Sequence, residues 1–375
     1  MNPAQIPPAR VGDPIADIDT PALLIDLDAL EHNIAHMAEL VADSPVAVRP
    51  HAKAHKTPAI ALRQMAAGAK GICCQKVGEA EVMVAAGVPN VLVTNQIVGT
   101  PKLRRLAGLA RQAWVGVCAD DAGNIDALND AALEVQATLN VLVEINVGSN
   151  RCGVAPGEPA LHLARRIAAA PGLRFCGLQA YQGSAQHKRS PAEREALIGA
   201  AIDMTRETVA LLERNGLSCE IVTGAGTGTF PLEQSSDLYN ELQVGSYIFM
   251  DADYRRNEVA NGRPFREFEA SLYVLCSVVS QATPGRCVVD AGHKSNAVDS
   301  GMPEPVWPDT TYSRPSDEHG LLTLGANAPA LSIGDKVRLI PGHCDPTVNL
   351  YDWMVGVRRE RVEVLWPVLA RGAAR

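Results

Sequence analysis

The alternation of short apolar runs with longer segments of helical periodicity is the feature that most constrains how this chain can fold. Leu30, Ile34, Met37 and Val41, for example, recur at the spacing of one helix face. Strands that alternate with helices form parallel sheets, and uninterrupted apolar strands are buried on both faces. We therefore predict an α/β fold with strands at 22–27, 46–51, 72–76, 90–95, 114–119, 139–146, 175–181, 220–225 and 242–247.

The number of apolar runs indicates how these strands are arranged. If the first run belongs elsewhere, the remaining eight, from residue 46 onward, can close a (β/α)8 barrel. An open doubly wound sheet is the competing architecture, but no G-x-G-x-x-G motif follows the first strand. After about residue 255, short apolar runs and turns without helices predict an antiparallel β domain. We therefore predict a barrel over 28–255 and a C-terminal β domain over 256–375.

The composition supports a large folded core and excludes several classes of function. Of the 375 residues, 47% are hydrophobic and 20% are charged, which excludes a disordered chain. A net charge of -8 provides no basic surface for a nucleic acid or an anionic membrane. The nine scattered cysteines form no C-x-x-C pair, and the N-terminus lacks the pattern of a signal peptide. No apolar stretch reaches the ~20 residues of a membrane span, so we expect a soluble cytoplasmic protein.

The first barrel strand leads into a lysine that is a candidate for covalent chemistry. In a (β/α)8 barrel, the C-terminal ends of the strands face the active site. This strand ends in Arg49-Pro-His51-Ala-Lys53. Lys53 is a candidate Schiff-base lysine, because the barrel mouth can withdraw its amine from water and keep it uncharged. The alternative is a solvated lysine in a strand-to-helix loop.

Two glycine-containing loops follow the last two predicted strands, where barrels commonly bind a phosphate. They are Gly224-Ala-Gly226-Thr227-Gly228 and Gly245-Ser246-Tyr247. Glycines let backbone N–H groups approach an anion closely, and hydroxyls add further donors. A tight turn explains either loop alone, but the position of both loops favours a phosphate. Because no Walker lysine is present, we expect the phosphate of a bound cofactor or substrate.

Other polar residues lie at or just beyond strand ends, namely Gln75, Arg151, Tyr181 and His187. Arg151 can neutralise a phenolate or carboxylate, and His187 can act as a general base near neutral pH. Taken alone, each is more often a structural or solvated residue.

A His-x-Asp pair follows an apolar run in the predicted β domain. In an extended segment, His343 and Asp345 would share one face while Cys344 points the opposite way. An imidazole and a carboxylate with open positions suit a divalent ion such as Mn²⁺, Mg²⁺, Co²⁺ or Zn²⁺. An ordinary hydrogen-bonded pair is the alternative.

Several short motifs occur in an order that resembles the D-threonine aldolase and D-serine dehydratase family, alanine-racemase-like enzymes of fold type III that use pyridoxal phosphate. The resemblance extends from about residue 18 to the C-terminus. The motifs are Asp19-Thr20-Pro21, Arg49-Pro-His51-Ala-Lys53, Gly71-Ile-Cys-Cys-Gln75-Lys76, Arg151-Cys-Gly-Val154, Gln179-Ala-Tyr181, Gly226-Thr227-Gly228, Gly245-Ser-Tyr247, Asp290-Ala-Gly292 and Pro341-Gly-His-Cys-Asp-Pro346.

This resemblance implies a pyridoxal-phosphate-binding barrel and a β domain completed by the N-terminal strand within residues 1–27. Lys53 matches the lysine that binds the cofactor covalently, and His187 matches a histidine proposed as the base. Ala225 is a departure, since the family often has a further glycine there. The implied cofactor-binding residues are Lys53, Gln75, Arg151, Tyr181, Gly226, Thr227, Gly245, Ser246 and Tyr247.

The resemblance also implies a metal and an activity. His343 and Asp345 match the metal pair of the aldolases, with Mn²⁺, Mg²⁺ or Co²⁺ expected before Zn²⁺, whereas the dehydratases carry His-x-Cys. We therefore expect a lyase that cleaves D-3-hydroxy amino acids of the D-threonine type to glycine and an aldehyde. The alternatives are a 3-hydroxyaspartate aldolase that releases glycine and glyoxylate, and a dehydratase that releases a 2-oxo acid and ammonia.

A rival from another class is a non-catalytic protein of pyridoxal phosphate homeostasis. The C-terminal β domain with its His-x-Asp pair argues against it, since such proteins lack that domain. The expected partners are an amino-acid substrate and a second copy in a homodimer, with neither nucleic acid nor membrane.

Overall fold

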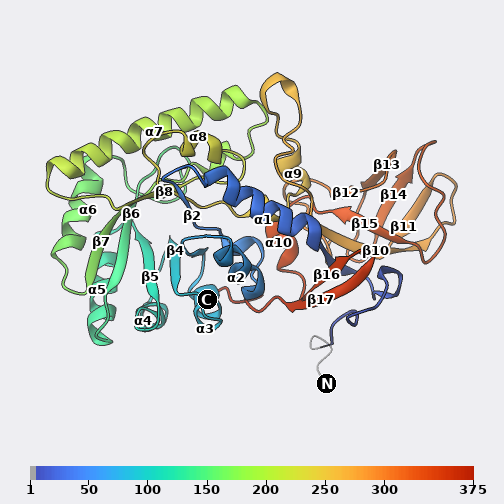
Figure 1. The fold of residues 1–375 in the computed structure, drawn as a ribbon, viewed down its shortest axis with the longest axis horizontal. Coiled ribbons are helices and arrows are strands. Elements are labelled where there is room, and N and C mark those ends of the chain that lie inside the picture. The colour runs from blue at the N-terminus through green and yellow to red at the C-terminus, as the bar shows by residue number, and fades with distance from the viewer. Residues whose placement is uncertain (1–5) are drawn as a thin grey trace.

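Eight parallel strands form a sheet that curls into a barrel, in the order β2-β9-β8-β7-β6-β5-β4-β3 (Figure 1). They are seen in the computed structural model, which describes residues 6–375 and leaves residues 1–5 of the predicted N-terminal segment outside. The two ends of the sheet meet where His51 forms a parallel bridge with Cys73. The strands are β2 (Ala47–Val48), β3 (Ile72–Cys74), β4 (Asn90–Gln96), β5 (Trp114–Ala119), β6 (Leu139–Glu144), β7 (Leu173–Gln179), β8 (Ile221–Gly224) and β9 (Glu241–Leu242).

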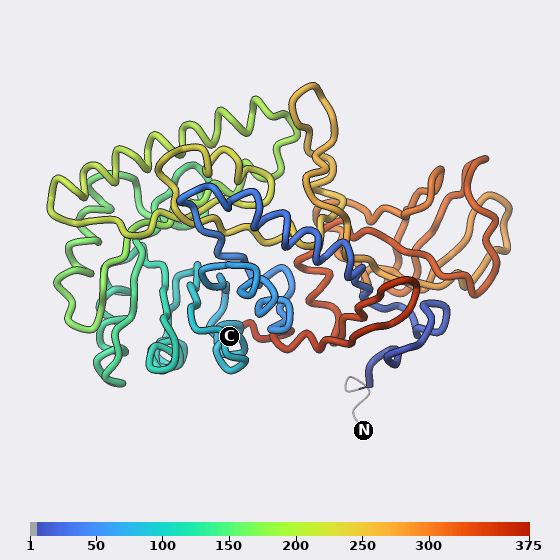
Figure 2. The backbone as a smooth tube through the Cα atoms, viewed as in Figure 1, coloured from blue at the N-terminus to red at the C-terminus, as the bar shows by residue number. Residues whose placement is uncertain are grey.

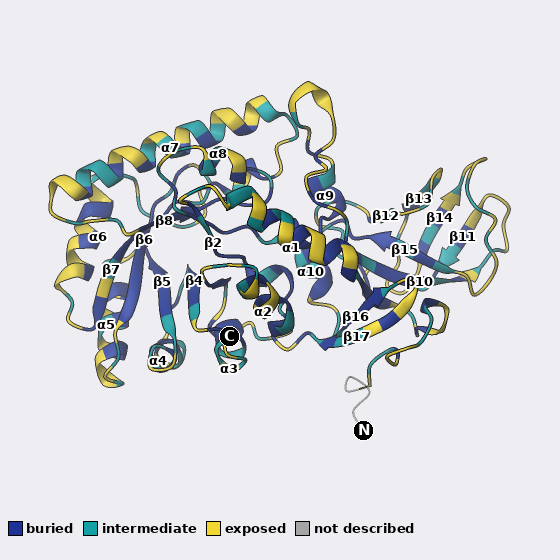
Figure 3. Cartoon of the chain, in the orientation of Figure 1, coloured by how far each residue is buried: buried dark blue, intermediate teal, exposed yellow. Residues whose placement is uncertain are grey.

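Helices connect the barrel strands and shield them from solvent (Figure 3). Proline occupies the first turn of several of them. The backbone N–H groups of that turn have no acceptor within the helix, so proline loses no hydrogen bond there. The helices between barrel strands are α2 (Pro58–Ala66), α3 (Val77–Ala85), α4 (Thr100–Leu109), α5 (Ala122–Glu134), α6 (Glu158–Ala169), α7 (Pro191–Arg214) and α8 (Phe230–Gln234). Helix α1 (Leu27–Val41) precedes the first barrel strand, α9 (Ala252–Arg255) follows the last one, and α10 (Cys344–Val348) lies between β15 (Lys336–Ile340) and β16 (Trp353–Arg358). None of the helices within residues 6–375 has the length and apolarity that crossing a membrane requires.

Helix α1 links the two parts of the molecule and confirms the predicted apolar stripe. The carboxylate of Asp26 caps its N-terminus by accepting from the N–H groups of Asp28 and Ala29. Leu30, Ile34 and Met37 are buried on one face, as their spacing predicts.

The second part is a nine-stranded sheet with mostly antiparallel pairing. The N-terminal strand β1 belongs to this sheet, because it pairs antiparallel with β10 and parallel with β16. The strands are β1 (Ala22–Asp26), β10 (Leu272–Ser280), β11 (Arg286–Val289), β12 (Glu304–Pro305), β13 (Thr310–Ser313), β14 (Gly320–Leu324), β15 (Lys336–Ile340), β16 (Trp353–Arg358) and β17 (Arg361–Pro367). The predicted fold class is thereby confirmed, while the domain boundary at 255/256 stays a prediction.

The two parts are packed through a shared apolar core. One buried cluster fills the region between the barrel and its helices, and a second runs from Val48 and Leu242 of the barrel to Val274 and Met354 of the β domain. The last residues of the chain return to the barrel beside α3, where the N–H of Gly78 donates to the carbonyl of Arg375 at 2.9 Å (Figure 2). The β domain is therefore fixed against the barrel rather than loosely tethered.

Candidate active site

A cavity lies at the C-terminal ends of the barrel strands and contains about 530 Å³ of empty space, its open mouth included. Eight of the residues that line it were predicted from the sequence, namely Lys53, Gln75, Arg151, Tyr181, Gly226, Thr227, Gly245 and Ser246. The remaining lining residues are His51, Thr94, Gln179, Ala225, Gln243 and Tyr254. The strand-end positions that the sequence indicated are thus brought together in one place.

Lys53 forms an ion pair with Asp345 that keeps both groups charged. It lies in a short 3₁₀ turn (Ala52–Ala54) directly after β2, and its Nζ contacts Oδ2 of Asp345 in α10. Withdrawal from water lowers the pKa of Lys53, but Asp345 together with Tyr181 outweighs this and raises it above its usual value. Burial raises the pKa of Asp345, yet Lys53 and His343 together outweigh burial and bring it to about 2. The partly buried carboxylate of Asp345 therefore favours the protonated form of the Lys53 amine as long as the two groups are paired.

His51 forms the wall of the cavity beneath Lys53 and is neutral. Burial, followed by the charge of Lys53, holds the pKa of His51 well below its usual value. Its Nδ1 accepts from the backbone N–H of Lys53 at 3.3 Å, which leaves the ring proton on Nε2. That nitrogen donates to Oγ1 of Thr94 at 3.1 Å, and the amide nitrogen of Gln75 donates to the same hydroxyl oxygen at 3.2 Å. These contacts fix Gln75 at the cavity wall.

Arg151 and Tyr181 lie against each other on another side of the cavity. The guanidinium carbon of Arg151 is 5.6 Å from the centroid of the Tyr181 ring. Its Nη2 is 3.9 Å from Oε1 of Glu144, and the Arg151 side chain is 55% exposed. A cation held by an aromatic face and a distant carboxylate can still bind an anionic ligand.

The glycine-containing loop after β8 has the features of a phosphate cradle. A Cβ added at Gly226 or Gly228 would collide with the buried Gln186, so the close approach requires glycine at both positions. The amide oxygen of Gln186 accepts from the N–H of Gly228 at 3.0 Å. Between the two glycines, Oγ1 of Thr227 is buried at the cavity without a hydrogen-bond partner. A buried donor without a partner suits an anionic group of a ligand.

Ala225 retains the backbone conformation of the glycine it replaces. Its φ is 66°, in the left-handed region that favours glycine. The departure from the family pattern therefore falls at a position whose backbone conformation glycine would adopt with less strain.

The loop after β9 contributes Gly245 and Ser246 to the cavity, whereas the side chain of Tyr247 points elsewhere. The Tyr247 ring is buried against Phe268, with 5.4 Å between the ring centroids. Its hydroxyl accepts from Nε2 of Gln64 at 3.0 Å. The Tyr247 side chain therefore lies outside the cavity, in contrast to the prediction, because its aromatic ring fills the apolar core behind the loop.

His343 and Asp345 are neighbours of the cavity, but their geometry differs from the prediction. The segment is not extended, because α10 begins at Cys344 with His343 as its N-cap residue. Cys344 does not point away from Asp345: its Sγ lies 3.3 Å from Oδ1 of that carboxylate. Nδ1 of His343 lies 2.7 Å from Oδ2 of Asp299, which leaves Nε2 for a ligand. Within residues 6–375, no group of three or more His, Cys, Asp or Glu side chains is arranged to hold a metal.

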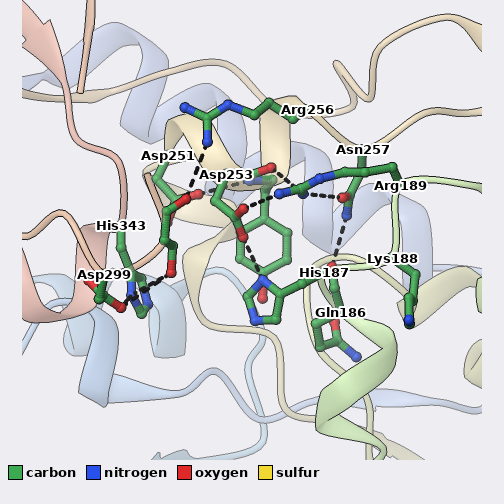
Figure 4. Close-up of polar contacts among 12 residues, drawn as sticks. Gln186, His187, Lys188, Arg189, Asp251, Asp253, Arg256, Asn257, Asp299 and His343 are labelled. Carbon is green, nitrogen blue, oxygen red and sulfur yellow. Dashed lines mark hydrogen bonds and ion pairs between the residues drawn. The ribbon is translucent and has the colours of Figure 1, made fainter. Parts of the chain in front are cut away.

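His187 lies beside the cavity rather than in its lining. Its ring centroid is 5.8 Å from that of Tyr254, a lining residue, and its side chain is 49% exposed. Nδ1 of His187 lies 2.5 Å from Oδ2 of the buried Asp253 (Figure 4). The hydrogen bond with Asp253 raises the pKa of His187 above its usual value.

The residues that hold the glycine-containing loop, His187 and His343 in place were not predicted from the sequence. Gln186, Asp253 and Asp299 reach their partners over 42, 66 and 44 residues of sequence. Of the three, only Gln186 could have been noticed in the sequence, because it directly precedes the candidate base His187. An alternation pattern identifies strand ends and cannot identify contacts made between distant loops.

Comparison with known proteins places this architecture in a class. The family model described as the alanine racemase N-terminal domain matches residues 25–253, and a putative serine dehydratase domain matches residues 271–357. The chain is 45% identical to a D-threonine aldolase of an Arthrobacter species, over 98% of this chain and 97% of that protein. It is 46% identical to a 3-hydroxy-D-aspartate aldolase of Paracoccus denitrificans, over 97% of this chain and 95% of that protein.

Among solved structures, the D-threonine aldolase from Filomicrobium marinum has a TM-score of 0.95 and 52% identity, covering 98% of this chain and all of that one. The barrel, the β domain and the cavity at the barrel mouth thus define an alanine-racemase-like lyase. More particularly, the chain belongs to the D-threonine aldolase and D-serine dehydratase family.

Proposed function

We propose that this protein is a pyridoxal-phosphate- and metal-dependent aldolase that cleaves D-3-hydroxy amino acids to glycine and an aldehyde. The observation that carries the proposal is the cavity that combines Lys53 with the Thr227 hydroxyl and two glycine loops. Similarity over nearly the whole chain to two aldolases of this substrate class supports it.

The residues of the cavity fit the proposed cofactor. The Gly226–Gly228 and Gly245–Ser246 segments and the Thr227 hydroxyl would hold the phosphate, and Lys53 would bind the aldehyde carbon. Arg151 would lie near the phenolic oxygen. When bound, pyridoxal phosphate acts as an electron sink for the charge left on Cα when a bond to that atom breaks.

The chain's own residues would bind the substrate and move its protons. His187 would take the proton of the substrate's β-hydroxyl through Nε2, because Nδ1 is engaged by Asp253. As the hydroxyl loses its proton, the Cα–Cβ bond would break and the distal fragment would leave as an aldehyde, and Cα would then take up a proton to give glycine. Lys53 must be neutral to form a covalent bond, so Asp345 then requires another cationic partner.

A divalent ion is the cationic partner that the donor chemistry suits. Nε2 of His343 and the carboxylate of Asp345 would hold it, with the remaining positions filled by water and the substrate's oxygen atoms. An ion there lowers the pKa of a coordinated hydroxyl and so assists removal of its proton. The identity of the ion among Mn²⁺, Mg²⁺ and Co²⁺ stays a prediction, as does the homodimer.

The experiment that tests the proposal is an assay of the products. Purified protein is incubated with pyridoxal phosphate and Mn²⁺ and with D-threonine or D-3-hydroxyaspartate in separate reactions. Glycine with acetaldehyde or glyoxylate supports an aldolase, and the better substrate distinguishes the two aldolase alternatives. Ammonia with a 2-oxo acid and no glycine would instead identify a dehydratase.

A further inference from the structure

A buried carboxylate holds one ring nitrogen of His187. Asp253, in the short helix α9, lies 2.5 Å from Nδ1 of His187 through its Oδ2 (Figure 4). The Asp253 side chain is 5% exposed, whereas that of His187 is 49% exposed. The carboxylate is therefore fixed inside the protein, while about half of the imidazole side chain is open to solvent.

The carboxylate is itself held by the loop that carries His187. Nη2 of Arg189 donates to Oδ1 of Asp253, and Nη1 donates to the Asp253 carbonyl at 2.8 Å and to Oδ1 of Asn257 at 2.7 Å. Asn257 in turn donates to the carbonyl of Gln186 at 2.9 Å. The loop and α9 thus form a closed circuit of hydrogen bonds around the imidazole.

We propose that Asp253 is the positioning residue of His187: it keeps the ring proton on Nδ1 and thereby presents the lone pair of Nε2 to the substrate. The inference rests on the proposed function, in which His187 accepts a proton. Without the carboxylate, a neutral imidazole can carry its proton on either nitrogen, and the Nε2–H form cannot act as the base.

The charges around His187 agree with this role. Facing it are Asp253 and Asp251 from the α9 segment, Arg189 from its own loop, and the ring of Tyr254. The hydrogen bond with Asp253 raises the pKa of His187 most, burial and Arg189 oppose this rise, and Asp251 adds to it. Removal of the Asp253 charge should therefore lower the pKa of His187, so that the base stays unprotonated at a lower pH.

The α9 segment that carries Asp253 also contacts the segment of the proposed metal pair. An effect on His187 can nevertheless be separated from an effect on metal binding. Oδ2 of Asp251 accepts from the N–H of Cys344 at 3.0 Å, next to His343 and Asp345. Asp253 instead contacts His187 and Arg189, so its replacement should leave Mn²⁺ affinity unchanged.

The first test is a mutant cycle in the holoenzyme. Asp253→Asn should lower kcat by roughly 10²-fold or more, but no further than His187→Ala, whose expected loss is ~10²–10⁴-fold. The acidic limb of kcat/KM should move to lower pH, and Asp253→Glu should restore part of the activity. In His187→Ala, adding Asp253→Asn should cost no more than about twofold, because the interaction is already lost. An unmoved acidic limb, or losses that multiply in the double variant, would overturn the inference.

The second test does not depend on catalysis, and its readout is the wild-type protein. Holoenzyme labelled with ¹⁵N-histidine is titrated by NMR, and the His187 signals are assigned by their absence in His187→Gln. The neutral ring of the wild type should be the Nδ1–H form, and the Nε2–H form would overturn the inference. A wild type that cleaves no D-3-hydroxy amino acid would refute the proposed function, while this measurement would still decide the role of Asp253.

Discussion

Replacement of Thr227 by valine should have opposite effects on the cofactor-free protein and on cofactor binding. Valine keeps the shape of threonine and removes the hydroxyl, which is buried without a partner. A buried polar group left unpaired costs ~1–3 kcal/mol, so Thr227→Val should stabilise the cofactor-free protein by about 1 kcal/mol. If that hydroxyl donates to a phosphate, its loss should cost ~1.5–3 kcal/mol of binding, or a rise in Kd of about 10- to 150-fold.

The assay compares melting temperatures of the cofactor-free proteins with affinities for pyridoxal phosphate and for pyridoxal, which lacks the phosphate. Thr229→Val is the matched control, because the Thr229 hydroxyl accepts from Gln186 at 2.7 Å and donates to Glu233 at 2.9 Å. The control Thr229→Val should therefore lose stability. Thr227→Val should lower the affinity for pyridoxal phosphate far more than the affinity for pyridoxal. The reasoning is refuted if Thr227→Val destabilises the cofactor-free protein or changes the affinity for pyridoxal phosphate by less than about twofold.

Three further results are expected. Arg49→Met should cost about 1.5–3 kcal/mol in chemical denaturation, because the fully buried Glu241 loses the Arg49 contact at 2.7 Å and keeps Lys70 at 2.8 Å. A double variant with Glu241→Leu should recover most of the loss, and a single-variant cost below about 1 kcal/mol would contradict this. Asp345→Ala should abolish Mn²⁺ binding in calorimetry while Cys344→Ser retains it, and the reverse pattern would move the metal ligand to the thiol. Burial raises the pKa of Glu233 to about 7, so the folded state binds this proton more tightly than the unfolded state and stability falls as pH rises from about 4.5 past 7. Glu233→Gln should remove up to about 3 kcal/mol of that fall, and equal pH dependence of melting in both proteins would refute the assignment.

The barrel and the cavity lining could be predicted because they follow from local patterns. Apolar runs identify strands, and the strand ends of a barrel necessarily meet at one face, which brought Lys53, Gln75 and Tyr181 together. The ion pair of Lys53 with Asp345 could not be predicted in this way, because the two residues are 292 positions apart in sequence.

The local geometry around His343 could not be predicted from the sequence pattern either. Alternation along an extended strand placed His343 and Asp345 on one face, but the chain turns into α10 instead. Thr347 stabilises this turn, since its hydroxyl donates to the carbonyl of His343 at 2.7 Å. A hydrogen bond of this kind competes with extended structure and leaves no trace in hydrophobic periodicity.

The side chain of Tyr247 illustrates a third limit. Its position after the last barrel strand predicted a contact with the phosphate, yet packing against Phe268 turns the ring into the core. The glycine and serine before it have no large apolar surface to bury, and they remain at the cavity.

The central claim, that the cavity around Lys53 binds the cofactor, is tested most directly by locating the cofactor on the chain. Protein loaded with pyridoxal phosphate is reduced with borohydride, digested and analysed by mass spectrometry. The account predicts one pyridoxyl-modified peptide, carrying the label on Lys53, and its loss in Lys53→Ala. A label on Lys56 or Lys294, or an unchanged yield in Lys53→Ala, would contradict it.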